Sequence, residues 1–111
     1  MVQDPQSYQR RMVLGRTGLE VNRMGFGGIP IQRVDEVAAI ATVRHAIDCG
    51  IDFIDTARAY TTSEQRIGRA LLETDKKVAL ASKSQLRTAD GIRREIETSL
   101  KNLQRDQLDL Y

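Results

Sequence analysis

The sequence predicts an α/β fold in which strands alternate with helices and lie parallel to one another. Two observations carry this prediction: short apolar runs alternate with longer segments of helical periodicity, and glycine or polar residues separate them. Connections of this kind are right-handed βαβ units, which bring the carboxyl ends of all strands to the same edge of the sheet. The length of 111 residues leaves room for one domain at most.

A short β-hairpin is expected before the alternating pattern begins. Residues 12–14 and 19–21 are apolar stretches on either side of a turn bounded by Gly15 and Gly18. Residues 1–11 are polar and lack the apolar core of a secretory signal, so we expect a flexible leader there. The first short strand of the sheet is predicted over residues 23–27.

The first helix is predicted over residues 36–48. Asp35 is a candidate N-cap and Gly50 is a stop signal. The inward face is expected at positions with helical spacing, namely Val37, Ile40, Ala41, Arg44 and Ile47. Directly after Gly50, residues 51–55 contain two isoleucines and a phenylalanine, a pattern typical of a strand that is buried between two layers.

Two more helices and two more strands follow. Thr62 and Gln65 stand at capping-box spacing before the apolar positions 67 and 70–72, which predicts a second helix with Gly68 as a mild flaw. Residues 78–82 predict the third strand. An apolar stripe opposite charged side chains predicts the third helix, and its members are Ile92, Ile96, Leu100 and Leu103. Residues 108–111 begin a further strand.

Because the chain stops inside this last predicted strand, we expect it to be a fragment of a larger fold. A complete (β/α)8 barrel needs about 250 residues, so this chain would hold less than half of one. The pattern alone also fits an alternative, a small and complete open α/β sheet.

Composition and charge argue against several classes of protein. The 17 basic and 15 acidic residues leave a net charge of +2, and the basic ones are scattered, so no nucleic-acid partner is expected. No uncharged apolar run approaches the roughly 18 residues of a membrane span. The single cysteine, Cys49, permits no internal disulfide, and we expect no metal site because there is neither a second cysteine nor a histidine cluster. A reducing cytoplasm is the default location, and no pattern indicates an oligomeric state.

Three ionisable side chains fall at equivalent places after successive strands. Asp55 ends the second predicted strand, Tyr60 lies in the loop after it, and Lys83 follows the third. Because neighbouring strands lie about 4.8 Å apart, Asp55 and Lys83 can pair across the rim while Tyr60 folds back over them. A close ammonium favours the phenolate form and makes proton donation by a phenol easier. Asp55 would hold Lys83 charged and oriented at a partly dry site.

Each member of this triplet also has a purely structural interpretation. An aspartate at a strand end usually caps a turn, and a tyrosine in a loop usually covers the edge of the core. Lys83 stands between two serines and is consistent with a solvated surface side chain. The triplet suits the reduction of a carbonyl, but the spacing alone does not identify the reaction.

The motifs of this sequence resemble those of the aldo-keto reductase family over about residues 12–111. Residues 50–60 (GIDFIDTARAY) are similar to the most specific signature of that family. Four further segments resemble its N-terminal hairpin, first strand, second helix and fourth strand, in that order: residues 14–21 (LGRTGLEV), 24–28 (MGFGG), 63–64 with 67–71 (SE and IGRAL), and 108–111 (LDLY).

This resemblance implies that the chain is the N-terminal part of a (β/α)8 TIM barrel, preceded by the hairpin that plugs the bottom of the barrel. It also implies an enzyme that binds NADPH at its carboxyl rim and reduces small-molecule aldehydes and ketones to alcohols by hydride transfer. Tyr60 matches the proton donor of the family, Lys83 the lysine that makes the phenol a better acid, and Asp55 the carboxylate paired with that lysine. Gly28 and Ile29 match places that approach the cofactor, and Asp55 also matches a place near the nicotinamide ribose.

The chain departs from the family pattern in two respects. The fourth catalytic residue of the family is a histidine about three positions beyond Tyr111, and His45, which we interpret as a helix-face residue, does not replace it. Thr61 stands where a glycine often follows the tyrosine. Because most cofactor contacts of the family come from later strands, we expect the isolated 111-residue chain to be inactive. Two alternatives are an NADPH-binding regulatory subunit of the same fold and a half-barrel that dimerises through exposed sheet edges.

Overall fold

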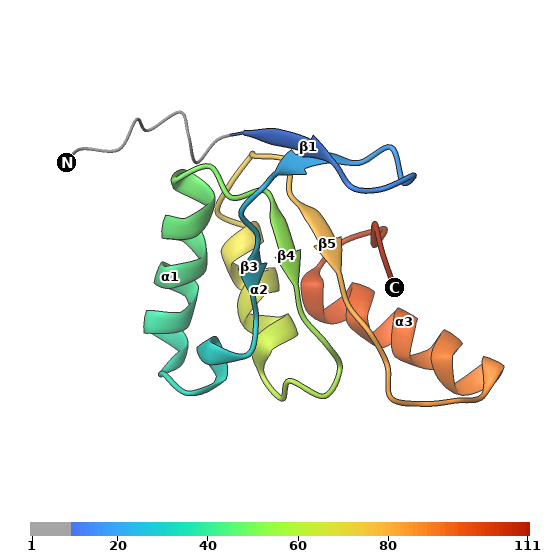
Figure 1. Ribbon diagram of the computed structural model, residues 1–111. Coiled ribbons are helices and arrows are strands. Elements are labelled where there is room, and N and C mark those ends of the chain that lie inside the picture. Colours follow the sequence, from blue (N-terminus) through green and yellow to red (C-terminus); the bar gives the residue numbers. More distant parts are fainter. Residues whose placement is uncertain (1–9) are drawn as a thin grey trace.

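The computed structural model describes residues 10–111 as a parallel sheet with three helices on one face and a hairpin at one end (Figure 1). The hairpin pairs β1 (Arg11–Val13) with β2 (Glu20–Asn22) in antiparallel fashion. The predicted hairpin is therefore present, but each strand lies one residue farther from the turn than predicted. Residues 1–9 of the expected leader lie outside the described residues, and Arg11 belongs to β1.

The sheet consists of three parallel strands in the order β3 (Phe26–Gly27), β4 (Phe53–Asp55) and β5 (Ala79–Ala81). Each strand is shorter than the sequence predicts, because regular ladder bonding is confined to two or three residues. Gly27, Asp55 and Ala81 stand beside one another in register, so the last residue of each strand lies at the same edge. This edge is the carboxyl rim of the sheet.

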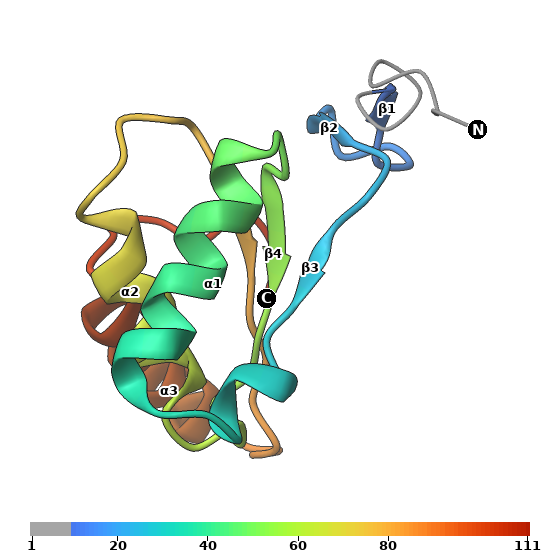
Figure 2. The same ribbon diagram turned by 90° about the vertical axis from the view of Figure 1, so that its left-hand side faces the viewer.

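The helices α1 (Glu36–Asp48), α2 (Ser63–Leu71) and α3 (Ala89–Leu103) lie on one side of the sheet (Figure 2). A short 3₁₀ helix, η2 (Pro30–Gln32), leads from β3 into α1. Ile54 of β4 and Leu80 of β5 are almost fully buried against the helical layer. Burial of apolar side chains between these two layers is the main favourable contribution to folding. None of the helices within residues 10–111 has the length and apolar content that crossing a membrane requires.

The inward face of α1 differs from the prediction. The buried positions are Ala39, Val43 and Ile47, whereas Val37 is 79% exposed. Apolar side chains occur around most of this helix, so the helical period alone could not select the face that packs. The predicted cap is present, because the Asp35 carboxylate accepts a hydrogen bond of 2.8 Å from the backbone N–H of Ala38.

The start of α2 also differs from the prediction, because no capping box forms. Thr62 has helical backbone angles and makes no side-chain cap bond. Gly68, which the sequence marked as a flaw, has a packing role: a β-carbon there would lie 2.2 Å from the carbonyl oxygen of Asn102 on α3. The missing side chain therefore lets α2 and α3 approach closely.

The predicted strand at residues 108–111 is present only as one bridge, which pairs Leu110 with Ala81 in parallel orientation. The α3 stripe is also only partly covered, since Leu103 is fully buried while Ile92, Ile96 and Leu100 are half-buried. Ser99, on the same helix, is fully buried although it is polar.

Candidate active site

Asp55 and Lys83 form an ion pair at the carboxyl rim. Asp55 is the last residue of β4, and Lys83 follows β5 by two positions, so neighbouring strands present the two side chains to each other. The Lys83 ammonium lies 3.2 and 3.1 Å from the two carboxylate oxygens of Asp55. It also donates to the backbone carbonyl of Thr56 at 2.9 Å. These three acceptors match the three N–H donors of an ammonium group.

Tyr60 lies in the loop between β4 and α2 and brings its ring to the same lysine. The ammonium nitrogen of Lys83 is 4.9 Å from the centroid of the ring. The backbone fixes this loop, because Ser63 N–H donates to the Tyr60 carbonyl at 2.8 Å and Tyr60 N–H to the Ala57 carbonyl at 3.2 Å. The structure thus brings the three predicted site residues together, while their catalytic roles stay predictions.

The electrostatics of Lys83 reflect opposing effects. Partial burial lowers its pKa, but hydrogen bonding to Asp55, the nearby Tyr60 side chain and the attraction of the Asp55 charge together raise the pKa above its ordinary value. The Lys83 and Asp55 side chains are both 48% exposed among the described residues 10–111, and the partly dry site stays a prediction.

Gly28 and Ile29, the predicted cofactor contacts, lie next to the same edge. Gly28 N–H donates to the Asp55 carbonyl at 2.8 Å, which continues the pairing of β3 with β4. A β-carbon on Gly28 would lie 2.5 Å from the hydroxyl oxygen of Ser63, so glycine is needed there for close packing. Ile29 begins the turn into η2 and is 44% exposed.

A buried charged network beside the triplet was not foreseen. The Glu64 side chain is 1% exposed and accepts hydrogen bonds from Arg58 at 2.9 Å and Ser82 at 2.7 Å. Burial raises the pKa of Glu64, but hydrogen bonds from Ser99, Ser82, Arg58 and Asn102 outweigh this effect and hold the pKa below its ordinary value.

A signal for this burial is present in the sequence. Glu64 lies three, four and seven positions before Ile67, Gly68 and Leu71, which places it on the apolar face of α2. The capping-box spacing of Thr62 and Gln65 predicts a helix start at the same place but does not indicate the burial of Glu64.

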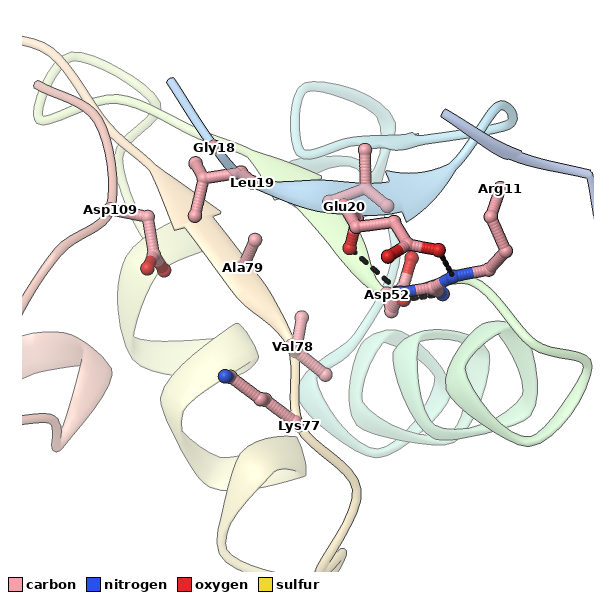
Figure 3. Close-up of a pocket in the computed structure, with 10 residues that line it drawn as sticks. Arg11, Gly18, Leu19, Glu20, Asp52, Lys77, Val78, Ala79 and Asp109 are labelled. Atoms are coloured by element: carbon pink, nitrogen blue, oxygen red, sulfur yellow. Dashed lines mark hydrogen bonds and ion pairs between the residues drawn. The ribbon is translucent and has the colours of Figure 1, made fainter. Parts of the chain in front are cut away.

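A separate cavity of about 350 Å³ lies at the other end of the sheet, under the hairpin (Figure 3). Arg11, Glu20 and Asp52 line it, and Arg11 forms ion pairs with both carboxylates. Asp109 also lines the cavity, and its carboxylate accepts a hydrogen bond of 2.8 Å from the Leu80 N–H. These acidic groups hold the hairpin and the chain after α3 to the sheet, and the triplet lies at the opposite rim.

His45 lies in the last turn of α1, at the end where the strands begin and away from the triplet. It is exposed, as expected for a helix-face residue, and its ring nitrogen is 3.5 Å from the exposed Cys49 thiol. Within residues 10–111, no group of three or more histidine, cysteine or acidic side chains is arranged to hold a metal ion.

Comparison with known proteins gives consistent results. The sequence profile described as "Aldo/keto reductase family" matches residues 23–111. The chain is 41% identical to aldo-keto reductase YhdN of Bacillus subtilis and 36% identical to L-galactose dehydrogenase of Arabidopsis thaliana, with 86% and 87% of this chain covered. Among solved structures, an aldo-keto reductase of Bacillus halodurans in its holo form has a TM-score of 0.78 at 28% identity and covers 90% of this chain.

The chain spans about a third of the two curated relatives, 34% and 35% of their lengths, and 38% of the Bacillus halodurans structure. The solved aldo-keto reductases that this chain resembles are (β/α)8 barrels, so the predicted fold class is confirmed. The predicted resemblance to the family is confirmed as well.

Proposed function

This chain belongs to the aldo/keto reductase family, and on that basis we propose that the full-length protein reduces aldehydes and ketones to alcohols with Tyr60 as proton donor. Family membership implies oxidoreduction of carbonyl compounds with NAD(P)H. The observation that best supports the residue assignment is the position of Lys83, whose ammonium lies 4.9 Å from the Tyr60 ring centroid and contacts Asp55.

The protein's own contribution to the reaction is a proton at the carbonyl oxygen. As Tyr60 gives up its hydroxyl proton to that oxygen, negative charge develops on the phenolate. The positive charge of Lys83 is already in place and stabilises this charge without reorganisation. Asp55 keeps the lysine protonated and oriented. After the alcohol leaves, solvent returns a proton to Tyr60.

The residues of this rim fit one end of a nicotinamide cofactor. The Asp55 carboxylate is 48% exposed and has lone pairs beyond those that Lys83 uses, so it can accept hydrogen bonds from ribose hydroxyls. Ile29 offers exposed apolar surface at the same edge, and Gly28 keeps that edge tightly packed. When bound, the cofactor supplies the hydride.

We propose NADPH as the physiological cofactor and the cytoplasm as the location of the reaction. Both are extensions of the family assignment, and a parallel assay with NADH tests the first. One relative is named L-galactose dehydrogenase, so the oxidation of sugars with NADP⁺ belongs in the same substrate panel.

The variant Tyr60→Phe tests the proposal in the full-length protein. We expect kcat for an activated aldehyde to fall by about 100-fold or more, the contribution of a general acid. The affinity for NADPH, followed by fluorescence quenching, should stay unchanged. Thr42→Val is the control for the loss of a hydroxyl group, because Thr42 is exposed on α1 and its hydroxyl donates to the Ala38 carbonyl of the same helix. Full activity of Tyr60→Phe would remove Tyr60 from this role, and a wild-type protein that binds NADPH with very slow turnover would favour the regulatory subunit.

A further inference from the structure

We infer that Glu64 and Arg58 are positioning residues that hold the loop carrying Tyr60 against the strand end carrying Lys83. This inference rests on the proposed function. It concerns a buried ionic network beside the triplet, whose members would act through the positions of Tyr60 and Lys83.

Arg58 joins three parts of the fold. Its backbone N–H donates to the carbonyl of Lys83 at 3.0 Å, so the Tyr60 loop is bonded directly to the residue that follows β5. Its guanidinium binds Glu64 on α2 at 2.9 Å and Glu95 on α3 at 2.6 Å. Because a guanidinium is planar and rigid, two carboxylates on different helices fix both its position and its orientation.

Glu64 connects the same two segments, the Tyr60 loop and the residues after β5, through its side chain. One of its carboxylate oxygens accepts from Arg58, two residues before Tyr60, and the other accepts from the hydroxyl of Ser82, one residue before Lys83. Asn102 of α3 adds a hydrogen bond at 3.1 Å. A single buried carboxylate therefore connects the segment that carries the phenol to the segment that carries the ammonium.

Stability alone does not explain a buried charge at this place. Burying ions is costly, and well-packed apolar side chains often serve stability equally well. What the network adds is a fixed geometry between two segments of backbone. The Tyr60 ring must stay close to Lys83 for the ammonium to act on the phenol, and a displacement of about 1 Å can cost 100-fold in rate.

Glu64→Gln in the full-length protein tests the inference, because it keeps the shape of the side chain and removes the charge. We expect kcat to fall by about 10- to 100-fold, with the NADPH affinity and the KM for the aldehyde nearly unchanged. Glu73→Gln is the matched control. Glu73 follows α2 and pairs with Arg44 at 2.9 Å, but both side chains are 49% exposed. The Glu73→Gln variant should therefore have the kcat of the wild type. A Glu64→Gln protein that is folded and retains wild-type kcat would overturn the inference.

Two further measurements apply if Glu64→Gln does not fold or if the protein shows no turnover. If Glu64→Gln does not fold, Glu95→Gln removes the second, more exposed carboxylate from Arg58 and should lower kcat in the same direction. Native-state hydrogen exchange gives a readout that needs no turnover. The amide of Arg58 should exchange about tenfold faster in the variant, as expected for the loss of a charged hydrogen bond, while the hairpin amide of Leu14 keeps its wild-type rate.

The exchange experiment also separates this inference from the proposed function. If the wild-type protein reduces no carbonyl compound, the proposed function fails. Faster exchange at Arg58 would then still support the network as the element that fixes the loop, and unchanged exchange would overturn it.

Discussion

The Lys83 ammonium lies over the ring of Tyr60, 4.9 Å from its centroid, while its three N–H groups face Asp55 and the Thr56 carbonyl. In the proposed mechanism the lysine would act on the phenol through its charge, because Asp55 and the Thr56 carbonyl bind its N–H donors. Lys83 therefore has two separate contacts, an ion pair with Asp55 and a position over the ring of Tyr60, and the proposed effect of each can be tested separately.

Removing the charge of Lys83 should impair the proton transfer. In the full-length protein we expect Lys83→Met to lower kcat by about 100-fold or more, because the phenolate that forms in the transition state loses its stabilising cation. The rate of NADPH oxidation with an activated aldehyde measures this effect. Lys76→Met is the control: Lys76 pairs with Asp48 at 3.7 Å on the exposed surface, and its loss should leave kcat unchanged. Equal rates for both variants would contradict the role of Lys83.

Removing the charge of Asp55 should change the pH dependence. Contact with Asp55 and Tyr60 raises the pKa of Lys83, so in Asp55→Asn this pKa should fall. The lysine then loses its proton at a lower pH, and the decline of kcat/KM on the alkaline side should shift to lower pH. Profiles of kcat/KM against pH for the wild type and the variant measure the shift. An alkaline limb that stays in place would show that Asp55 does not set the protonation of Lys83.

Most of this rim follows from the sequence, because its geometry depends on local order. Asp55 and Lys83 each come at the end of an apolar run, and parallel βαβ connections place such positions side by side whatever the details of packing. The close approach of Tyr60 to Lys83 needed more information, since the loop of seven residues between β4 and α2 can take many paths. The signature at residues 50–60 supplied that information through its resemblance to a family.

The parts that the sequence did not predict depend on contacts between distant segments. The inward face of α1 could not be derived, because Val37 and Val43 are equally apolar and only the position of the sheet decides between them. The burial of Glu64 depends on hydrogen-bond donors that are distant in sequence: Ser82, just after β5, and Asn102 of α3 lie eighteen and thirty-eight positions away. The sequence places Glu64 on the apolar face of α2, but a charged residue in the first turn of a helix is usually exposed, so only the positions of its partners explain its burial.

Thr61 has a left-handed backbone, with φ of +39°, which is rare for a β-branched residue. Its hydroxyl donates to the side-chain carbonyl of Gln32 at 2.9 Å and so ties the Tyr60 loop to η2. Asparagine tolerates this backbone better and keeps a polar side chain, so Thr61→Asn should stabilise the protein by about 1 kcal/mol. Urea unfolding measures the change. Thr62→Asn, at a φ of −95°, carries no such strain and should give no gain.

The contact of α2 with α3 at Gly68 predicts a packing defect. A β-carbon at this position would lie 2.2 Å from the Asn102 carbonyl oxygen, and backbone cannot move as a flexible side chain can. We expect Gly68→Ala to destabilise the protein by about 1–2 kcal/mol, since overpacking outweighs the better helix propensity of alanine. Gly27→Ala is the control, because no atom lies within 4 Å of its added carbon. A Gly68→Ala protein as stable as the wild type would show that the helices can separate freely.

Acid should weaken the fold through Glu64. The pKa of this buried carboxyl lies below its ordinary value of about 4.5, because hydrogen bonds to its charged form outweigh the cost of burial. The contribution of Glu64 to the free energy of unfolding is therefore complete above the unfolded-state pKa and is lost as the pH falls through the lower, folded-state value.

Glu64→Gln removes the titrating group, so the variant should be less stable than the wild type at pH 7 by about 1–3 kcal/mol. This difference in the free energy of unfolding should become smaller in acid. Urea unfolding from neutral pH to about pH 3 measures both curves. Glu73→Gln should parallel the wild type throughout, because exposed pairs contribute at most about 1 kcal/mol. If the Glu64→Gln and wild-type curves run parallel instead, some other carboxylate controls the acid sensitivity of the fold.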